Sequence, residues 1–306
     1  MSVPVLVITV IFSTLAFLAI VYFAVGFFLA KYLSKPKRFD AEYCHKIDVE
    51  KGLIPENIPE LKREPLNIIS FDGELIHGDY SPAPNSRGVI ITAHGYTWTR
   101  EGNVKYARMF YNAGFSVYLF DERGHGKNTT KYTTMGYKEG KDVAAIVNYF
   151  RNMLGKNALI GLHGESLGAA CVMMSLKETN EVDFAIEDCG YISLSKLLQH
   201  VIKPMHVPAF FLWGADISLR LFFHYSYKKV NPGEAAASSK VPMLIIHGDA
   251  DNFIPLENGK EIYSLCSNHA KIEIFPGADH ALSYQSDPER YTKIVNDFVD
   301  HIRKEK

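Results

Sequence analysis

The first thirty residues contain no charged side chain, unlike the rest of the chain. Val, Ile, Leu, Phe and Ala dominate residues 1–30, and roughly 20 helical residues suffice to cross a hydrocarbon core of about 30 Å. A cleaved signal peptide normally has a basic start and a shorter apolar run. A buried core helix fits poorly because no polar face interrupts the run. The pattern therefore predicts an uncleaved transmembrane helix over residues 1–30.

Basic residues follow this apolar run at once, namely Lys31, Lys35, Lys37 and Arg38. Positive residues beside a membrane span tend to stay on the cytoplasmic side. We therefore expect a single-pass protein of the cell membrane whose main domain faces the cytoplasm. Residues 31–65 mix charge and proline without a sustained period, which predicts a juxtamembrane connector that lies against that domain.

From Leu66 onward, short apolar runs alternate with longer helical patterns. Leu66–Ser70 and Leu75–Tyr80 flank Asp72-Gly73, a strong hairpin signal. Later strands are expected at Gly88–Ala93, Phe115–Phe120, Ala158–His163, Val182–Glu187, Pro242–His247 and Lys271–Phe275, with helices near 99–112, 138–153, 166–178, 256–267 and 287–302. The alternation is typical of an α/β domain. Residues 66–306 thus predict an eight-stranded, mostly parallel sheet with helices on both faces.

One long stretch breaks the alternation. Residues 191–239 are rich in aromatic side chains and are interrupted by Pro204, Pro208 and Pro232. We expect helical material that lies over the sheet edge as a cap. Its runs Pro208–Trp213 and Leu221–Phe223 would either line an apolar acyl pocket or only pack the cap onto the domain.

Composition narrows the classes of function. With 306 residues, of which 47% are hydrophobic and 22% charged, the chain is long enough to bury a large core. The net charge of −1 and the lack of long basic runs in the predicted domain make nucleic acid an unlikely partner. The cysteines have no zinc-ligand spacing and are expected to be free buried thiols: Cys44, Cys171, Cys189 and Cys266.

The segment Gly164-Glu165-Ser166-Leu167-Gly168 directly follows a predicted strand and opens a predicted helix. In that setting G-x-S-x-G forms a sharp turn that presents the serine hydroxyl, with glycines where side chains would collide. A phosphate-binding loop is the rival interpretation, but neither nucleotide-binding glycine pattern is present. The pattern predicts Ser166 as a nucleophile.

A serine nucleophile needs a base. In folds that present the serine on a G-x-S-x-G turn between a strand and a helix, the catalytic residues follow in the chain order Ser, then Asp or Glu, then His. Beyond Asp249 and Asp251 only His269, His280 and His301 remain. His280 is the best placed of these, because it lies in a loop just past a predicted strand end. Both Asp249 and Asp251 follow the preceding strand, and spacing alone does not choose between them.

The oxyanion formed at an attacked carbonyl requires two N–H donors. The backbone N–H of Leu167 is one expected donor, since it follows the nucleophile. The strand Gly88–Ala93 ends in His94-Gly95-Tyr96, which predicts the N–H of Tyr96 as the second donor. We expect His94 to be a structural residue that is bonded to its loop.

These motifs together resemble the α/β-hydrolase superfamily, and within it the serine aminopeptidase and monoacylglycerol-lipase-like branch. The matching segments are His94-Gly95, Asp121–Gly126, Gly164–Gly168, His247–Asp251 with Ile254-Pro255, and Gly277–His280. The resemblance covers about Leu66 to the C-terminus.

That resemblance implies Asp251, rather than Asp249, as the catalytic acid. It also implies structural roles for Arg123 and His125. The family usually has a serine where this chain has Asn128, a mild departure that leaves the triad intact.

The expected function is that of a serine hydrolase, carboxylesterase- or lipase-like, which cleaves an ester or thioester of a hydrophobic acyl group through Ser166, His280 and Asp251. The substrate would be a small acyl ester or a lipid-like molecule, and no metal or organic cofactor is expected. Two alternatives stay open: a serine peptidase, and an inactive hydrolase fold that serves as a membrane-tethered binding module.

Overall fold

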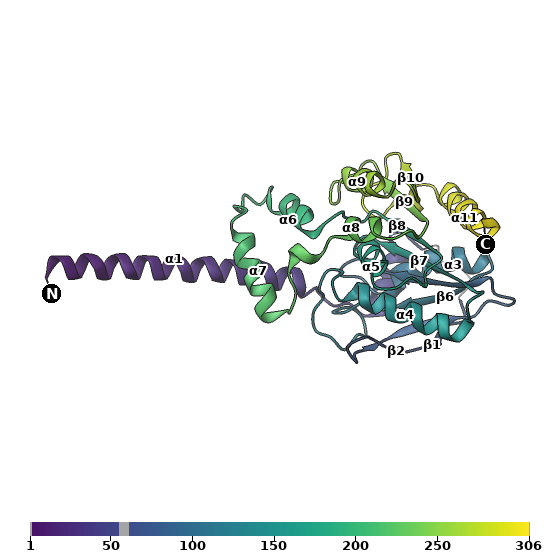
Figure 1. Cartoon of the computed structure of the whole chain (residues 1–306), viewed down its shortest axis with the longest axis horizontal. Coiled ribbons are helices and arrows are strands. Elements are labelled where there is room, and N and C mark those ends of the chain that lie inside the picture. Colours follow the sequence, from purple (N-terminus) through teal and green to yellow (C-terminus); the bar gives the residue numbers. More distant parts are fainter. Residues whose placement is uncertain (1, 55–60, 306) are drawn as a thin grey trace.

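The computed structural model describes residues 2–54 and 61–305. Met1 of the predicted anchor and Ile58-Pro59 of the predicted connector lie outside these residues. A long helix, α1 (Val3–Ser34), projects from an α/β body, and a set of cap elements lies where the two meet (Figure 1). The helix is long and apolar enough to cross a membrane by length and composition.

The body is built on one eight-stranded sheet, as predicted. The strand order is β1-β4-β6-β5-β7-β8-β9-β10. Strands β1 and β4 and strands β4 and β6 pair antiparallel, and all later neighbours pair parallel. Their bounds are β1 Glu64–Pro65, β4 Gly78–Ser81, β5 Gly88–Ala93, β6 Ser116–Phe120, β7 Leu159–Glu165, β8 Phe184–Asp188, β9 Met243–Gly248 and β10 Ala270–Phe275.

The predicted hairpin at Asp72-Gly73 is present, but it lies outside the large sheet. Strand β2 (Ile68–Ile69) pairs antiparallel with β3 (Leu75–Ile76) in a two-stranded sheet of its own. The predicted strand Leu75–Tyr80 is therefore divided, and its second half continues as β4. The short strand β1, which precedes the predicted Leu66–Ser70 run, takes the edge position instead.

Helices cover both faces of the sheet and bury two apolar clusters. One cluster includes side chains of α4 (Glu139–Leu154), α5 (Leu167–Ser175) and α9 (Glu257–Cys266). The other includes side chains of α3 (Val104–Asn112) and α11 (Pro288–Glu305). The remaining short helices of the body are η1 (Arg100–Asn103) and α10 (Ser283–Ser286). Because helices lie on both faces, the central strands are buried on both sides.

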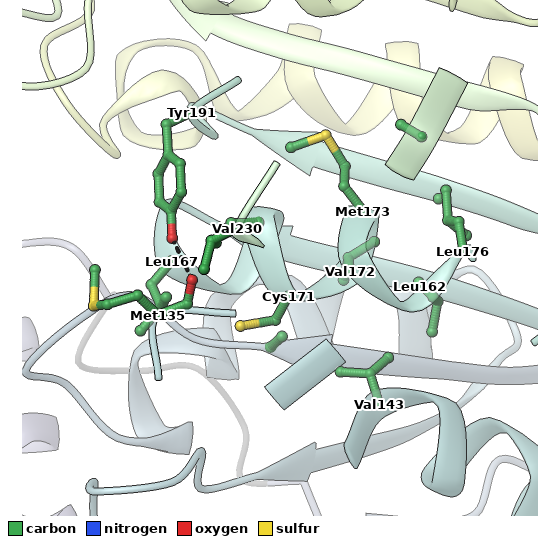
Figure 2. Packing of buried hydrophobic residues seen from close by; sticks show 14 of the residues in the cluster. Met135, Val143, Leu162, Leu167, Cys171, Val172, Met173, Leu176, Tyr191 and Val230 are labelled. Atoms are coloured by element: carbon green, nitrogen blue, oxygen red, sulfur yellow. Dashed lines mark hydrogen bonds between the residues drawn. The ribbon is translucent and has the colours of Figure 1, made fainter. Parts of the chain in front are cut away.

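Helix α5 is buried along its whole length. Figure 2 shows its side chains, including Cys171, Val172 and Met173, enclosed by residues of the sheet, of α4 and of the cap. Beside it, the Tyr191 hydroxyl donates a hydrogen bond of 2.8 Å to the Met135 carbonyl. A helix that is apolar on all sides belongs in the interior of a protein, and this one holds the turn before it in place.

The cap consists of α6 (Leu194–Ile202), α7 (Phe211–Phe222), η2 (Tyr227–Lys229) and α8 (Pro232–Ala237). Helix α8 packs against α5 and α9, whereas α7 packs mainly against α1. Figure 1 shows α7 crossing α1 near the end of α1 that is closest to the body.

The connector contains a helix that the sequence did not predict, α2 (Ala41–Glu50). The Asp40 side chain caps it by accepting a hydrogen bond of 2.7 Å from the Tyr43 N–H, a common way to satisfy the free N–H groups at a helix start. Helix α2 packs against η1. This part of the segment between α1 and the sheet thus contacts the domain through a regular element.

Candidate active site

The turn between β7 and α5 holds Ser166 in a strained backbone conformation, with φ +57° and ψ −113°. Its N–H donates a hydrogen bond of 2.8 Å to the Asp188 carbonyl at the end of β8. A Cβ on Gly164 would lie 2.3 Å from the Gly168 carbonyl oxygen, and one on Gly168 would lie 2.0 Å from the Ala93 carbonyl oxygen. Only glycine fits at these two positions, which is why the motif needs both.

A continuous chain of hydrogen bonds joins the predicted triad. Ser166 Oγ lies 2.9 Å from His280 Nε2, and His280 Nδ1 lies 2.7 Å from Asp251 Oδ2. The other carboxylate oxygen of Asp251 accepts hydrogen bonds from the N–H groups of Phe253 and Ile254, at 2.9 and 2.8 Å. These bonds fix the orientation of a buried carboxylate, which in turn orients the imidazole.

The two aspartates that the spacing left open take different positions. Asp249 Oδ1 accepts a hydrogen bond of 2.6 Å from the Gly277 N–H, so this side chain ties together the loops after β9 and β10. Of these two aspartates, Asp251 is the one that bonds to the His280 ring. His269 immediately precedes β10 and lies near His301, beside the amino ends of β9 and β10. Both histidines are therefore at the sheet edge opposite Ser166.

The predicted oxyanion donors lie on either side of the nucleophile. Leu167 is the first residue of α5, and the first N–H groups of a helix have no partner within it. A Cβ added to Gly95 would lie 3.7 Å from Ser166 Cβ, so the loop after β5 runs close beside the serine. The next residue, Tyr96, extends its hydroxyl toward α1 and donates to the carbonyls of Tyr32 and Leu33, at 3.0 and 3.2 Å.

Two buried histidines stabilise this loop and its neighbour. His94 Nε2 accepts from the Glu122 N–H at 3.0 Å, and His125 Nε2 accepts from the Thr97 N–H at 3.1 Å. The Nδ1 atoms lie 2.8 Å from the carbonyls of Gly95 and Arg123. Burial lowers the pKa of both rings, well below the usual value for His125. With Glu122 they are close enough to suggest a metal site, but these hydrogen bonds occupy all four ring nitrogens.

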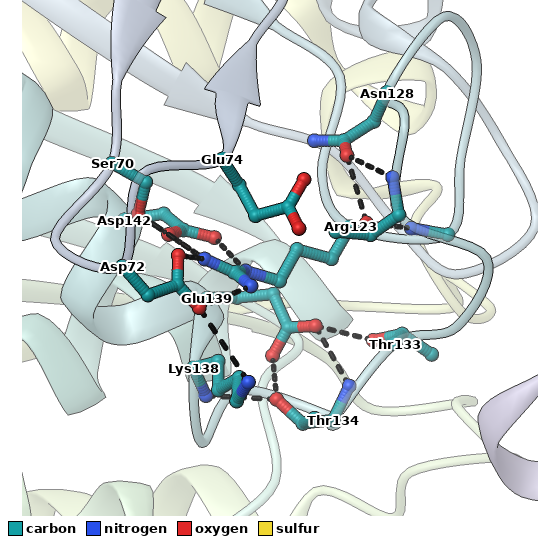
Figure 3. Close-up of polar contacts among 12 residues, drawn as sticks. Ser70, Asp72, Glu74, Arg123, Asn128, Thr133, Thr134, Lys138, Glu139 and Asp142 are labelled. Carbon is teal, nitrogen blue, oxygen red and sulfur yellow. Dashed lines mark hydrogen bonds and ion pairs between the residues drawn. The ribbon is translucent and has the colours of Figure 1, made fainter. Parts of the chain in front are cut away.

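Arg123 lies in a separate polar cluster, shown in Figure 3. Its guanidinium pairs with Asp142 and with Asp72, both at 2.6 Å, and Ser70 also bonds to Asp142. Asn128, which stands where the family usually has serine, holds its own loop: its side chain bonds to the Asp121 carbonyl and to Thr130. The geometry agrees with the structural roles expected from the resemblance.

A cavity of about 380 Å³ opens beside Ser166 and His280. Among the described residues it is lined by three from the connector, Asp48, Lys51 and Leu53, together with Gly95, Tyr96, Thr97, Trp98, Gly102, Lys105, Glu165, Phe253, Ala281 and Leu282. None of these lining residues comes from the cap. The structure therefore does not support the alternative in which the aromatic runs of the cap line this cavity.

Sequence reasoning missed the charged part of this cavity. Lys105 Nζ lies 2.8 Å from Glu165 Oε2, and the Tyr106 hydroxyl donates to the same oxygen at 2.6 Å. Asp48 accepts a hydrogen bond of 2.9 Å from Trp98 Nε1, and burial raises the pKa of Asp48. The Asp40 cap was the available signal for the helix that carries Asp48.

A family model described as serine aminopeptidase, S33, matches residues 84–213, from the start of β5 into α7. The sheet order and the nucleophile turn agree with that match. The chain has the α/β-hydrolase fold and is similar to that family over residues 84–213.

Solved structures share the fold of this α/β hydrolase. An esterase from Pyrococcus furiosus superposes with a TM-score of 0.69 at 23% identity, covering 88% of this chain and 98% of that chain. An acylaminoacyl peptidase from Pyrococcus horikoshii gives a TM-score of 0.60 at 19% identity, covering 82% of this chain and 43% of that chain.

Curated relatives match over most of the length of the chain. The uncharacterized protein YqkD of Bacillus subtilis (strain 168) is 28% identical over 251 residues, which are 81% of this chain and 82% of the relative. The protein bem46 of Schizosaccharomyces pombe is 24% identical over 294 residues, which are 94% of this chain and 92% of the relative.

Proposed function

We propose that this α/β hydrolase is a membrane-anchored serine hydrolase that cleaves an ester or thioester of a hydrophobic acyl group. The observation that carries the proposal is the hydrogen-bonded series Ser166, His280 and Asp251 at the wall of a cavity. The fold shared with an esterase supports the reaction class. The α1 helix supports the membrane anchor, and the basic residues after it support a cytoplasmic catalytic domain.

In the proposed reaction, Ser166 Oγ attacks the acyl carbonyl carbon while His280 Nε2 accepts the hydroxyl proton. The N–H groups of Leu167 and Tyr96 stabilise the negative charge on the carbonyl oxygen. The tetrahedral intermediate expels the alcohol or thiol, which takes the proton from His280. Water then gives a proton to His280 as its oxygen attacks the acyl-enzyme. The second tetrahedral intermediate expels Ser166 Oγ, which takes that proton from His280, and the carboxylic acid is released.

The cavity favours a short acyl chain. Its volume of about 380 Å³ lies at the low end of the roughly 300–1,000 Å³ typical of small-molecule sites. Leu53, Trp98, Phe253 and Leu282 give it apolar walls, against which the acyl chain would lie. A serine peptidase is the second candidate, supported by the fold shared with the acylaminoacyl peptidase.

Labelling with a fluorophosphonate probe tests the proposal in detergent-solubilised full-length protein. We expect the wild type to be labelled and both Ser166→Ala and His280→Ala to lose labelling. The exposed Ser264 and the distant His269 offer matched controls, Ser264→Ala and His269→Ala, which should label like the wild type. A folded wild type that does not label would contradict the proposal and favour the inactive binding module.

The substrate class is tested with p-nitrophenyl and thioester substrates of increasing acyl length, beside aminoacyl amides. The proposal predicts the highest kcat/KM for short or medium acyl esters. A clear preference for the amides would favour the peptidase.

A further inference from the structure

Helix α7 and the residue before it carry large apolar side chains that stay largely exposed in the described chain. Phe210, Trp213, Ile217, Leu221 and Phe222 are between 41% and 68% exposed. The first four follow one another at intervals of three or four residues, which places them on one side of the helix. We name these five residues the α7 stripe. Exposed apolar patches of this kind mark interaction surfaces in soluble proteins.

The side of α7 next to the stripe packs tightly on α1, and Phe210 itself belongs to both surfaces. A Cβ added to Gly26 would lie 2.4 Å from the Gly214 carbonyl carbon, so the two backbones touch where the helices cross. Tyr22 stacks on Phe210 and Phe211, with ring centroids 5.8 and 5.6 Å apart. The Tyr22 hydroxyl also donates to the Phe210 carbonyl at 3.0 Å. Helix α7 is thus fixed to the helix that is proposed to cross the membrane.

The point where α7 crosses α1 determines how deep α7 would lie relative to a bilayer. Roughly 20 helical residues span the hydrocarbon core, and the helix begins at Val3. The residues before Gly26 are long enough to span, and the first charged residue, Lys31, lies within two helical turns after Gly26. A helix that crosses there lies at the boundary between acyl chains and headgroups.

The residue types in and beside the α7 stripe are those that occur at the boundary between acyl chains and headgroups. Tryptophan and basic side chains gather at membrane interfaces, and Lys228 Nζ lies 5.4 Å from the Trp213 ring centre. The exposed Lys229 follows it in the chain, and anionic headgroups attract such residues. Neighbouring α1 is itself exposed and apolar from Val3 onward, so one apolar surface continues from the anchor onto the cap.

We propose that α7 lies in the membrane interface beside α1, with the α7 stripe in contact with lipid. The proposal rests on the membrane anchor of the proposed function. It makes the cap a second membrane contact and places the catalytic edge of the sheet close to the bilayer surface. The occupant of the stripe is a lipid bilayer, because the stripe continues the surface of the anchor.

The two tryptophans allow a direct test, since Trp98 lines the cavity and Trp213 belongs to the stripe. The full chain is reconstituted into vesicles of phosphatidylcholine and phosphatidylglycerol, with or without bromine on the acyl chains near the carbonyl. Trp98→Phe leaves Trp213 as the emitter, and we expect brominated lipid to quench most of its emission. Trp213→Phe leaves Trp98, whose emission should change little.

Each other result overturns the proposal in a recognisable way. Protein that does not float with the vesicles contradicts the anchor as well. Protein that floats but keeps a red-shifted, unquenched Trp213 emission leaves the anchor intact and places α7 in water. A blue-shifted but unquenched emission would show that the stripe is covered by protein, such as a second copy of the chain.

A pair of aspartate variants adds a functional readout. Leu221→Asp puts a charge into the stripe, whereas Leu265→Asp puts one on the exposed face of α9. We expect Leu221→Asp to lower kcat/KM several-fold for an ester carried in vesicles and to leave the rate on a soluble ester unchanged. Leu265→Asp should change neither rate. Equal behaviour of the two variants on the vesicle ester would overturn the proposal.

Discussion

Two polar clusters follow the central strands of the sheet. They differ in whether their side chains face only other protein groups or also a cavity. In the cluster around Arg123, each carboxylate faces the guanidinium or another donor, and the side chain of Arg123 is only 3% exposed. In the cluster around Ser166, the imidazole of His280 is 22% exposed at a cavity wall. Charges that are buried and paired, as around Arg123, thus indicate a stabilising role. A hydrogen-bonded series that reaches a cavity wall, as at Ser166, indicates a catalytic role.

The largest expected effect separates Asp251 from Asp249. Asp251→Asn removes the acceptor that orients His280, and the corresponding change in a serine protease lowers kcat by about 10⁴-fold. Steady-state hydrolysis of the best short ester measures this loss. Asp249→Asn keeps an oxygen for the Gly277 N–H and should retain nearly full activity. Similar losses in the two variants would refute the assignment of Asp251.

The next effect concerns stability and involves Arg123. Arg123→Met would leave Asp142 buried without its partner, and breaking a buried ion pair in this way typically costs about 3–5 kcal/mol. Denaturation in detergent measures the free energy of unfolding. We expect the remaining folded protein to keep the wild-type kcat, determined by titrating active sites with the fluorophosphonate probe.

Arg303→Met, an exposed change on α11, is the control and should leave stability unchanged. If Arg123→Met lowered kcat per active site while the fold stayed intact, the division between the two clusters would be wrong.

The pH dependence of stability provides a third test, which concerns two buried carboxyl groups, Glu187 and Asp188. Burial raises the pKa of Glu187 to about 8 and that of Asp188 to about 7. A carboxyl whose pKa is raised on folding stabilises the folded state fully at low pH, and that contribution is lost as the pH rises through the folded pKa. The contribution is fully present only below the unfolded pKa of roughly 4, so we expect the melting temperature to fall between about pH 4 and pH 8, in part because of these two groups.

Glu187→Gln removes one of these ionisations and keeps an acceptor for the Gly190 N–H, which donates to Glu187 at 2.8 Å. The fall in melting temperature between about pH 5 and pH 8 should be shallower in this variant. Thermal unfolding from pH 5 to pH 9 measures it, and an unchanged slope would show that Glu187 does not titrate in this range.

The smallest expected effect tests the link between α1 and the site. Tyr96→Phe removes the hydroxyl that bonds to the end of α1, and a net hydrogen bond is worth about 0.5–1.5 kcal/mol. We expect kcat to fall by roughly two- to tenfold with KM unchanged, because the loop that presents the proposed oxyanion donor loses a support. Tyr111→Phe, whose hydroxyl lies 3.5 Å from the Pro82 carbonyl, should have no effect.

Much of the fold and site was predictable from local patterns. The parallel strands, the helices between them and the turn at Ser166 depend on apolar runs and on glycines, whose effects are local in the sequence. The resemblance to the family, rather than spacing, selected Asp251 over Asp249, and the structure brings Asp251 to His280.

The parts that were missed depend on contacts between distant segments. Asp48 reaches the cavity only because α2 packs on η1, and nothing near residue 48 indicates that contact. The aromatic runs of the cap fit two environments equally well by composition. Their actual environment depends on α1, which lies almost two hundred residues earlier in the chain.

The close crossing of Gly26 and Gly214 has a practical consequence for producing the protein. Shortening the chain to start after Ser34, in order to obtain a water-soluble enzyme, would uncover the inner side of α7 and remove the hydroxyl of Ser34, which bonds to Tyr225 at 3.0 Å. It would also remove the carbonyls that receive the Tyr96 hydroxyl. Removing α1 would thus remove the helix against which α7 of the cap packs, so purification should retain it.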